Sequence, residues 1–152
     1  MSLAIGSPAP AFTLPDTEAR PFSLTQTRGH KTLLVFIPFP WTGNCDGEAC
    51  TLRDHLADLN ALDANVVIVT CYPRPANKKW AAENGFGFPV LSDFWPHGEV
   101  CRLYGAFNEE RGSANRTTFV LDAEGVVREI VASGSLGTPR EYAAYVEALG
   151  RF

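Results

Sequence analysis

The chain has 152 residues, of which 45% are hydrophobic and 20% charged, with a formal net charge of -4. These values describe one globular domain, residues 1–152, long enough to bury a core, and they exclude a disordered or collagen-like chain. The acidic balance argues against general binding to nucleic acid. No apolar run approaches the ~18 residues of a membrane span, and the first residues lack the pattern of a signal peptide. We therefore expect a cytoplasmic protein with no membrane contact.

The chain contains four cysteines, Cys45, Cys50, Cys71 and Cys101. It is too long to be a secreted disulfide miniprotein, so these residues are buried apolar side chains, metal ligands or reactive thiols. A structural zinc site favours tight Cys-x-x-Cys pairs, and the chain has none, while its three histidines are scattered. We therefore expect no metal.

Several elements are expected in the first half of the chain. Short strands at 12–14 and 21–24 flank a turn-rich segment and predict a β-hairpin. The apolar run 31–39 predicts a strand that is buried on both faces, and the composition of 40–44 predicts a loop. A helix follows, because apolar residues recur at steps of three or four along one face: Ala49, Leu52, Leu56 and Leu59.

The second half alternates strands and helices. We expect a buried strand at 65–72, a short helix at 77–83 ending near Gly85, a strand at 88–91 and a helix at 98–107. Strands at 117–121 and 126–132 flank a strong turn signal, and a helix at 139–149 closes the chain with Pro139 in its first turn. This order predicts an α/β fold with a mixed central sheet, flanking helices and an N-terminal β-hairpin extension.

Cys45 follows the first buried strand and opens a helix. The free amides and the dipole of a helix N-terminus stabilise a thiolate there. Asp46 and Glu48 oppose this stabilisation, so a cation is needed, and Arg116, just before the strand at 117–121, is a candidate. From position alone, a buried and unreactive Cys45 is an equal alternative.

Pro38, Thr42 and Cys45 match the pattern Pro-x-x-x-Thr-x-x-Cys, which resembles the active-site motif of the peroxiredoxins. Segment 6–14 is similar to the N-terminal signature of that family, and 116–122 to its later arginine strand. Segment 88–98 most resembles the AhpE-like branch found in actinobacteria. The resemblance covers nearly the whole chain, and it implies a thioredoxin-like fold and a thiol-dependent peroxidase that uses no metal, haem or flavin.

The resemblance also implies roles for single residues. Cys45 would be the peroxidatic cysteine, whose thiolate attacks hydrogen peroxide or an organic hydroperoxide and becomes a sulfenic acid. Thr42 would orient the thiolate and the peroxide through one hydrogen bond. Arg116 would offer a permanent positive charge to both, and Pro38 would shape the loop and shield the site.

Two further residues are candidates beside this site. Glu48 would tune the site or relay protons, with a surface acid favoured by the helix dipole as the alternative. Trp80, like Trp41 and Trp95, would wall the pocket or an interface, with an ordinary place in the core as the alternative.

Cys50, five residues after Cys45, is the candidate resolving cysteine. On an intact helix this spacing corresponds to about 7.5 Å and about 140°, whereas a disulfide needs Cα atoms within roughly 7 Å and converging side chains. Resolution by Cys50 therefore requires the first turn to unwind, and the alternative is a small buried residue. The AhpE-like branch is associated instead with an external thiol such as mycothiol, together with a mycoredoxin. The resemblance therefore implies a reducing thiol or a thioredoxin- or mycoredoxin-type protein as partner. Cys71 is expected in the core, and Cys101 in the core or at an interface, with a resolving role for Cys101 as the alternative.

Other functions are compatible with the same cysteine. A peroxide sensor or holdase-type interaction protein would use Cys45 without significant turnover. A thioredoxin-like disulfide reductase is disfavoured because Cys-x-x-Cys is missing. The family commonly forms homodimers, and two-fold pairing is the usual symmetry of soluble oligomers, so we expect a homodimer.

Overall fold

The computed structural model describes residues 3–133 and 138–152, with the backbone alone at Cys45. At its centre lies a mixed five-stranded sheet in the order β5–β4–β3–β8–β9. The strands are β3 (Lys31–Phe36), β4 (Ala64–Thr70), β5 (Val90–Ser92), β8 (Thr117–Leu121) and β9 (Val127–Ala132). β4 pairs in parallel with both β3 and β5, while β8 runs antiparallel to β3 and β9.

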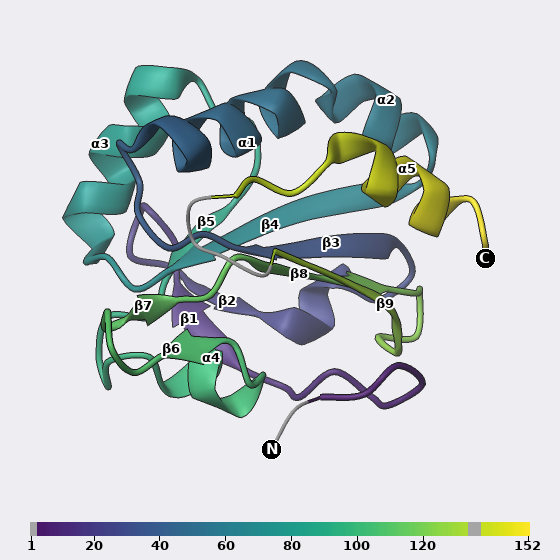
Figure 1. Cartoon of the computed structure of the whole chain (residues 1–152), viewed down its shortest axis with the longest axis horizontal. Coiled ribbons are helices and arrows are strands. Elements are labelled where there is room, and N and C mark those ends of the chain that lie inside the picture. Colours follow the sequence, from purple (N-terminus) through teal and green to yellow (C-terminus); the bar gives the residue numbers. More distant parts are fainter. Residues whose placement is uncertain (1–2, 134–137) are drawn as a thin grey trace.

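The sheet is covered on both faces (Figure 1). One face carries α1 (Gly43–Asp54), α2 (Leu56–Ala61), α3 (Arg74–Asn84) and α5 (Tyr142–Leu149). The other carries α4 (Glu99–Leu103), the hairpin of β1 (Thr13–Pro15) and β2 (Pro21–Ser23), and the 3-10 turn η1 (Leu24–Thr27). A small hairpin, β6 (Phe107–Asn108) with β7 (Ser113–Ala114), follows α4. The predicted α/β architecture with a mixed sheet and N-terminal hairpin is confirmed.

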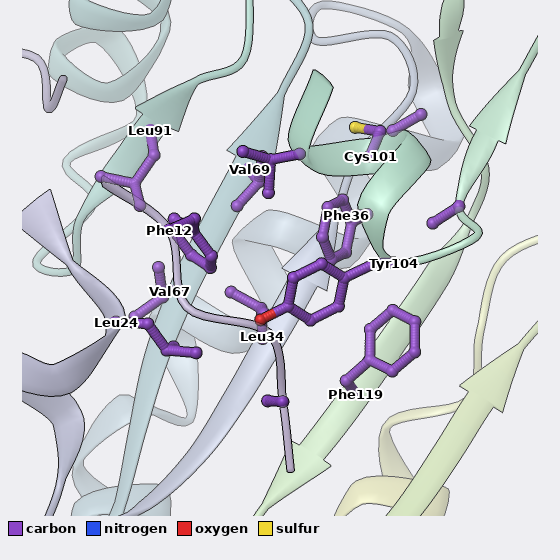
Figure 2. Close-up of a cluster of buried hydrophobic side chains, with 14 of the residues drawn as sticks. Phe12, Leu24, Leu34, Phe36, Val67, Val69, Leu91, Cys101, Tyr104 and Phe119 are labelled. Carbon is purple, nitrogen blue, oxygen red and sulfur yellow. The ribbon is translucent and has the colours of Figure 1, made fainter. Parts of the chain in front are cut away.

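The sequence of β3 does not alternate apolar and polar residues, because both faces of the strand are buried. Leu34 and Phe36 join the cluster beneath the hairpin and α4, while Leu33 and Val35 join the cluster beneath the other helices. Figure 2 shows the first of these clusters, where the Tyr104 ring lies near Phe36. From Thr32 to Phe36 both faces of the strand are dry, so each of these positions is apolar or fully buried, whereas Lys31 at the start of the strand is only partly buried.

β3 ends at Phe36, not at residue 39 as predicted. The Ile37 amide still donates to the Val69 carbonyl at 2.9 Å. Pro38 has no N–H to continue the ladder, and the chain turns away there toward α1.

The helix predicted after the loop is interrupted at His55, which separates α1 from α2. The hydrogen-bond ladder nevertheless continues, from the His55 amide to Thr51 at 3.1 Å and from the Leu59 amide to His55 at 3.0 Å. The predicted apolar face is therefore retained: Ala49, Leu52 and Leu59 are buried, and Leu56 packs against the same cluster.

Three other helix boundaries were wrong, and the first is the start of α3, which lies at Arg74 and not at residue 77. The helix expected at 98–107 ends at Leu103, because Gly105 takes a left-handed conformation with φ 67° that redirects the chain into β6. The last helix begins at Tyr142, so Pro139 lies before it. The Arg140 amide donates to Glu48 at 2.6 Å instead of entering the helix. Within the described residues, no helix is long and apolar enough to cross a membrane.

Candidate active site

The site is built around the start of α1, where Cys45 is the third helical residue. Thr42 is the N-cap by position, but its hydroxyl does not cap the helix. It donates to the Phe39 carbonyl at 2.6 Å. Because a hydroxyl has one proton and two lone pairs, Thr42 Oγ1 is left to accept a hydrogen bond from a neighbour. Pro38 is buried in the loop that leads to this turn.

Asp46, in the first turn of α1, is hydrogen-bonded both to the preceding loop and to α3. Its Oδ1 atom accepts from the Trp41 amide and from Trp80 Nε1, each at 2.8 Å. The Trp80 side chain is fully buried in the core on the helical face of the sheet. Trp80 therefore positions α1 through Asp46. Of the other tryptophans, Trp41 is exposed and stacks on Tyr72, and Trp95 is the most exposed large apolar residue described.

Glu48 lies one turn further along α1 and is buried against two arginines. Its Oε1 atom accepts from Arg116 Nη1 and from Arg140 Nη2, the latter at 3.1 Å. Its Oε2 atom accepts from the Arg140 amide at 2.6 Å and from Arg140 Nε at 2.8 Å. The surface-acid interpretation of Glu48 is thus wrong, because only 5% of this side chain is exposed.

The charges of this cluster decide its protonation. Burial raises the pKa of Glu48, but the hydrogen bonds and charge of Arg140, together with the charge of Arg116, outweigh burial and hold that pKa below its ordinary value. One carboxylate against two guanidinium groups leaves one net positive charge. That charge lies beside the first two turns of the helix that carries Cys45, which favours an anion there.

Arg140 is the functional candidate that the sequence did not reveal. Its Nη1 atom donates to Thr118 Oγ1 at 3.1 Å, and that hydroxyl is hydrogen-bonded to the Tyr145 hydroxyl at 2.9 Å. The residue links α1, β8 and α5, although it is 92 positions from Glu48 in the chain. No periodicity or spacing marks it, and the only signal was the unpaired acid on α1.

A pocket of about 360 Å³ opens beside this cluster, between α1 and the segment before α5. Its lining includes Gly43, Asn44 and Glu48 from α1 and Arg140 from the opposite wall. The pocket therefore reaches the residues that adjoin Cys45 in the chain. A small polar ligand fits such a volume, with the Glu48–arginine cluster in its wall.

Cys50 faces a different neighbour. Its Sγ atom donates to Asn84 Oδ1 on α3 at 3.5 Å, and burial raises the pKa of this thiol. α1 is continuous from Gly43 to Asp54, so residues 45 and 50 stand on an intact helix. The structure thus brings Arg116 and Glu48 together, whereas it turns Cys50 toward α3.

The mixed sheet, the N-terminal hairpin and a cysteine opening the helix after β3 define a thioredoxin-like protein. Residues 5–130 match the model of the AhpC/TSA family. The chain is 48% identical over 127 residues to the alkyl hydroperoxide reductase E proteins of Mycobacterium tuberculosis and Mycobacterium bovis, covering 83% of each chain. It is 28% identical over 134 residues to peroxiredoxin Bcp of Escherichia coli, covering 84% of this chain and 85% of that one.

Solved structures agree with these sequence matches. The AhpC of Enterococcus faecalis superposes with a TM-score of 0.89 at 25% identity, covering 99% of this chain and 92% of that one. The peroxidoxin BcpB of M. tuberculosis gives 0.84 at 28% identity, covering 97% and 95%. The chain belongs to the AhpC/TSA family and is a peroxiredoxin, a thiol-dependent peroxidase.

Proposed function

We propose that this chain reduces hydrogen peroxide or an organic hydroperoxide through a sulfenic acid at Cys45. The supporting observation is the cluster of Glu48, Arg116 and Arg140 beside the first turns of α1, with its net positive charge. That charge and the helix N-terminus favour the Cys45 thiolate, which is the nucleophile. The named activity of the mycobacterial relatives supports the substrate class.

In the proposed step the Cys45 thiolate attacks one peroxide oxygen. The S–O bond forms as the O–O bond breaks, the attacked oxygen keeps its hydrogen in the sulfenic acid, and the leaving oxygen takes a proton from solvent to become water or an alcohol. Thr42 Oγ1, whose proton is engaged by Phe39, accepts the O–H of the peroxide and orients it. Arg116 stabilises the charge that develops on the leaving oxygen.

A second thiol then attacks the sulfenic sulfur, and a disulfide forms with loss of water. We propose Cys50 as this resolving thiol. Because Cys45 and Cys50 stand on an intact helix and the Cys50 thiol bonds to Asn84, the first turns of α1 must unwind and that contact must break. An external thiol or a thioredoxin- or mycoredoxin-type protein is the other route, and it needs no unwinding. We also propose that the protein is cytoplasmic and forms a homodimer.

The test is steady-state peroxide consumption with dithiothreitol, a low-molecular-weight thiol or a thioredoxin-type protein as reductant. We expect turnover by the unmodified chain and none by Cys45→Ser. A Cys50→Ser chain that keeps full turnover with every reductant would overturn the resolving role alone. A single oxidation of Cys45 with no turnover by any reductant would instead identify a peroxide sensor.

A further inference from the structure

Cys71 and Cys101 lie outside the Cys45 site and are in contact with each other. Cys71 follows the last residue of β4, and Cys101 lies in α4, where Figure 2 shows it at the cluster of buried hydrophobic side chains. Their Sγ atoms are 3.6 Å apart, and the residues are 4% and 0% exposed. The sequence predicts Cys71 as a core residue and Cys101 as a residue of the core or of an interface, each considered separately. The structure adds that the two buried thiols adjoin.

We propose that Cys71 and Cys101 form a second redox site, which closes to an intramolecular disulfide. An S–S bond is about 2.05 Å long, so the sulfurs need to approach by roughly 1.5 Å. α4 is suited to this movement because it is five residues long and is flanked by left-handed glycines, Gly98 with φ 71° and Gly105 with φ 67°. Closure would tie this helix to the end of β4.

Asp93 borders the pair and binds the backbone of the helix that carries Cys101. Its Oδ1 accepts from the Val100 amide at 3.1 Å and its Oδ2 from the Cys101 amide at 2.8 Å, which anchors the start of α4. The hydrogen bond with Cys71, burial and the charge of Asp93 raise the pKa of Cys101. Cys101 is therefore held as a thiol, and we expect this buried pair to oxidise more slowly than a thiolate at a helix N-terminus.

The same cluster has the donors of a metal site, since ligand atoms of Cys71, Asp93 and Cys101 all lie within 4.8 Å of one another. Zinc would require both thiols to lose their protons beside a carboxylate that already serves α4. The contact between the two sulfurs at 3.6 Å needs no such loss of protons. The contacts therefore favour a disulfide over a metal.

The oxidant is a hydroperoxide or a small disulfide. With a hydroperoxide, the sulfur of Cys71, the more exposed of the two, attacks oxygen, so that an S–O bond forms and the O–O bond breaks. The thiol proton of Cys71 passes to the leaving oxygen, which departs as an alcohol or water. The sulfur of Cys101 then displaces hydroxide from Cys71, and water leaves with the thiol proton. In total, two thiols and one hydroperoxide give a disulfide, an alcohol or water, and one further water.

The test begins with a Cys45→Ser, Cys50→Ser chain, which keeps only this pair. The chain is incubated with oxidised dithiothreitol or with hydrogen peroxide, alkylated under denaturing conditions and digested with trypsin. Cleavage after Arg53, Lys78, Lys79 and Arg102 places Cys71 on peptide 54–78 and Cys101 on peptide 80–102. We expect a loss of two hydrogens in the intact chain and a cross-link between these peptides.

Controls distinguish oxidation of the Cys71–Cys101 pair from oxidation at Cys45 and Cys50, on which the proposed peroxidase activity rests. In the unmodified chain Cys45 and Cys50 both lie on peptide 32–53, so each cysteine pair is mapped independently and either can fail alone. Cys71→Ser must abolish the cross-link. Because the disulfide closes a loop of about 30 residues, the oxidised chain should melt about 5–10 °C higher than the reduced one.

Two results would overturn the proposal. One is complete alkylation of Cys71 and Cys101 after both oxidants, in the double variant and in the unmodified chain. The other is stoichiometric zinc in the reduced chain that disappears in Cys71→Ser, since it would assign these thiols to a metal.

Discussion

Arg140 holds the carboxylate of Glu48 at three points, through its amide at 2.6 Å, its Nε at 2.8 Å and its Nη2 at 3.1 Å. Both side chains are almost fully buried. This contact ties the segment before α5 to α1, and it leaves the positive charge of Arg116 and Arg140 together larger than the charge of the acid. The electrostatics at Cys45 therefore depend on a residue close to the end of the chain.

Removing Arg140 should be costly for both stability and activity. In Arg140→Ala, Glu48 keeps its ion pair with Arg116 but loses the one with Arg140. Loss of one member of a buried ion pair lowers the free energy of unfolding by about 3–5 kcal/mol. The excess positive charge is also lost, so peroxide consumption should fall. Urea unfolding and peroxide kinetics check both effects.

The matched control is Arg128→Ala. Arg128 also pairs with an acid, Asp122 at 3.3 Å, but its side chain is 47% exposed. An exposed pair is worth less than about 1 kcal/mol. Equal losses in stability and activity for the two variants would contradict the role given to Arg140.

The lowered pKa of Glu48 predicts a stability effect in acid. The folded chain holds the pKa below the ordinary value of 4.5, so near that pH the unfolded chain binds more protons. The contribution of ionised Glu48 to the free energy of unfolding is complete above about pH 4.5. It is lost as the pH falls through the pKa that Glu48 has in the folded chain. Unfolding free energies of the unmodified chain and Glu48→Gln should therefore converge below pH 4.5. A difference that stays constant between pH 7 and pH 3 would refute this.

Thr42 should act through its hydroxyl oxygen. Thr42→Val keeps the shape but removes the acceptor and the hydrogen bond to Phe39, so the peroxide loses its orientation. We expect a fall on the order of 10²-fold in the rate of peroxide reduction. Thr42→Ser keeps the hydroxyl and should retain most of the rate. If valine performed as well as serine, the hydroxyl would have no part in the step.

The hydrogen bond between Trp80 and Asp46 should couple α3 to the start of α1. Trp80→Phe removes the indole donor, and Asp46→Ala removes the acceptor. A hydrogen bond to a charged group is worth about 1.5–3 kcal/mol, so the double-mutant cycle should show a coupling of that order in unfolding free energy. Strict additivity would mean that the bond contributes nothing.

The sequence predicts those parts of the fold that depend on local pattern. The dry strand β3, the apolar face of α1 and α2, and the turn before β9 follow from residues that lie close together in the chain. The predicted ends of helices were wrong where a long-range contact or a glycine determines where the helix begins or ends. α5 starts late because Glu48 binds the Arg140 amide, and α4 stops early at Gly105.

In the candidate site, too, features set by local sequence were predictable, whereas contacts between residues far apart in the chain were not. The positions of Thr42 and Cys45 at the start of a helix follow from a short motif, whereas the partners of Glu48 lie 68 and 92 residues away. Arg116 was expected to supply the cation because two acids required one. Arg140 was not expected, and neither was the contact between Cys71 and Cys101. Side-chain contacts between distant elements leave no periodic signal in one sequence.

The most direct test of the central claim is a single-turnover titration of the fully reduced chain with hydrogen peroxide, without added reductant. The fast phase should consume one equivalent of peroxide per chain and modify peptide 32–53, and it should vanish in Cys45→Ser. Fast consumption that persists in Cys45→Ser would contradict the assignment of Cys45 as the peroxide-reducing thiol.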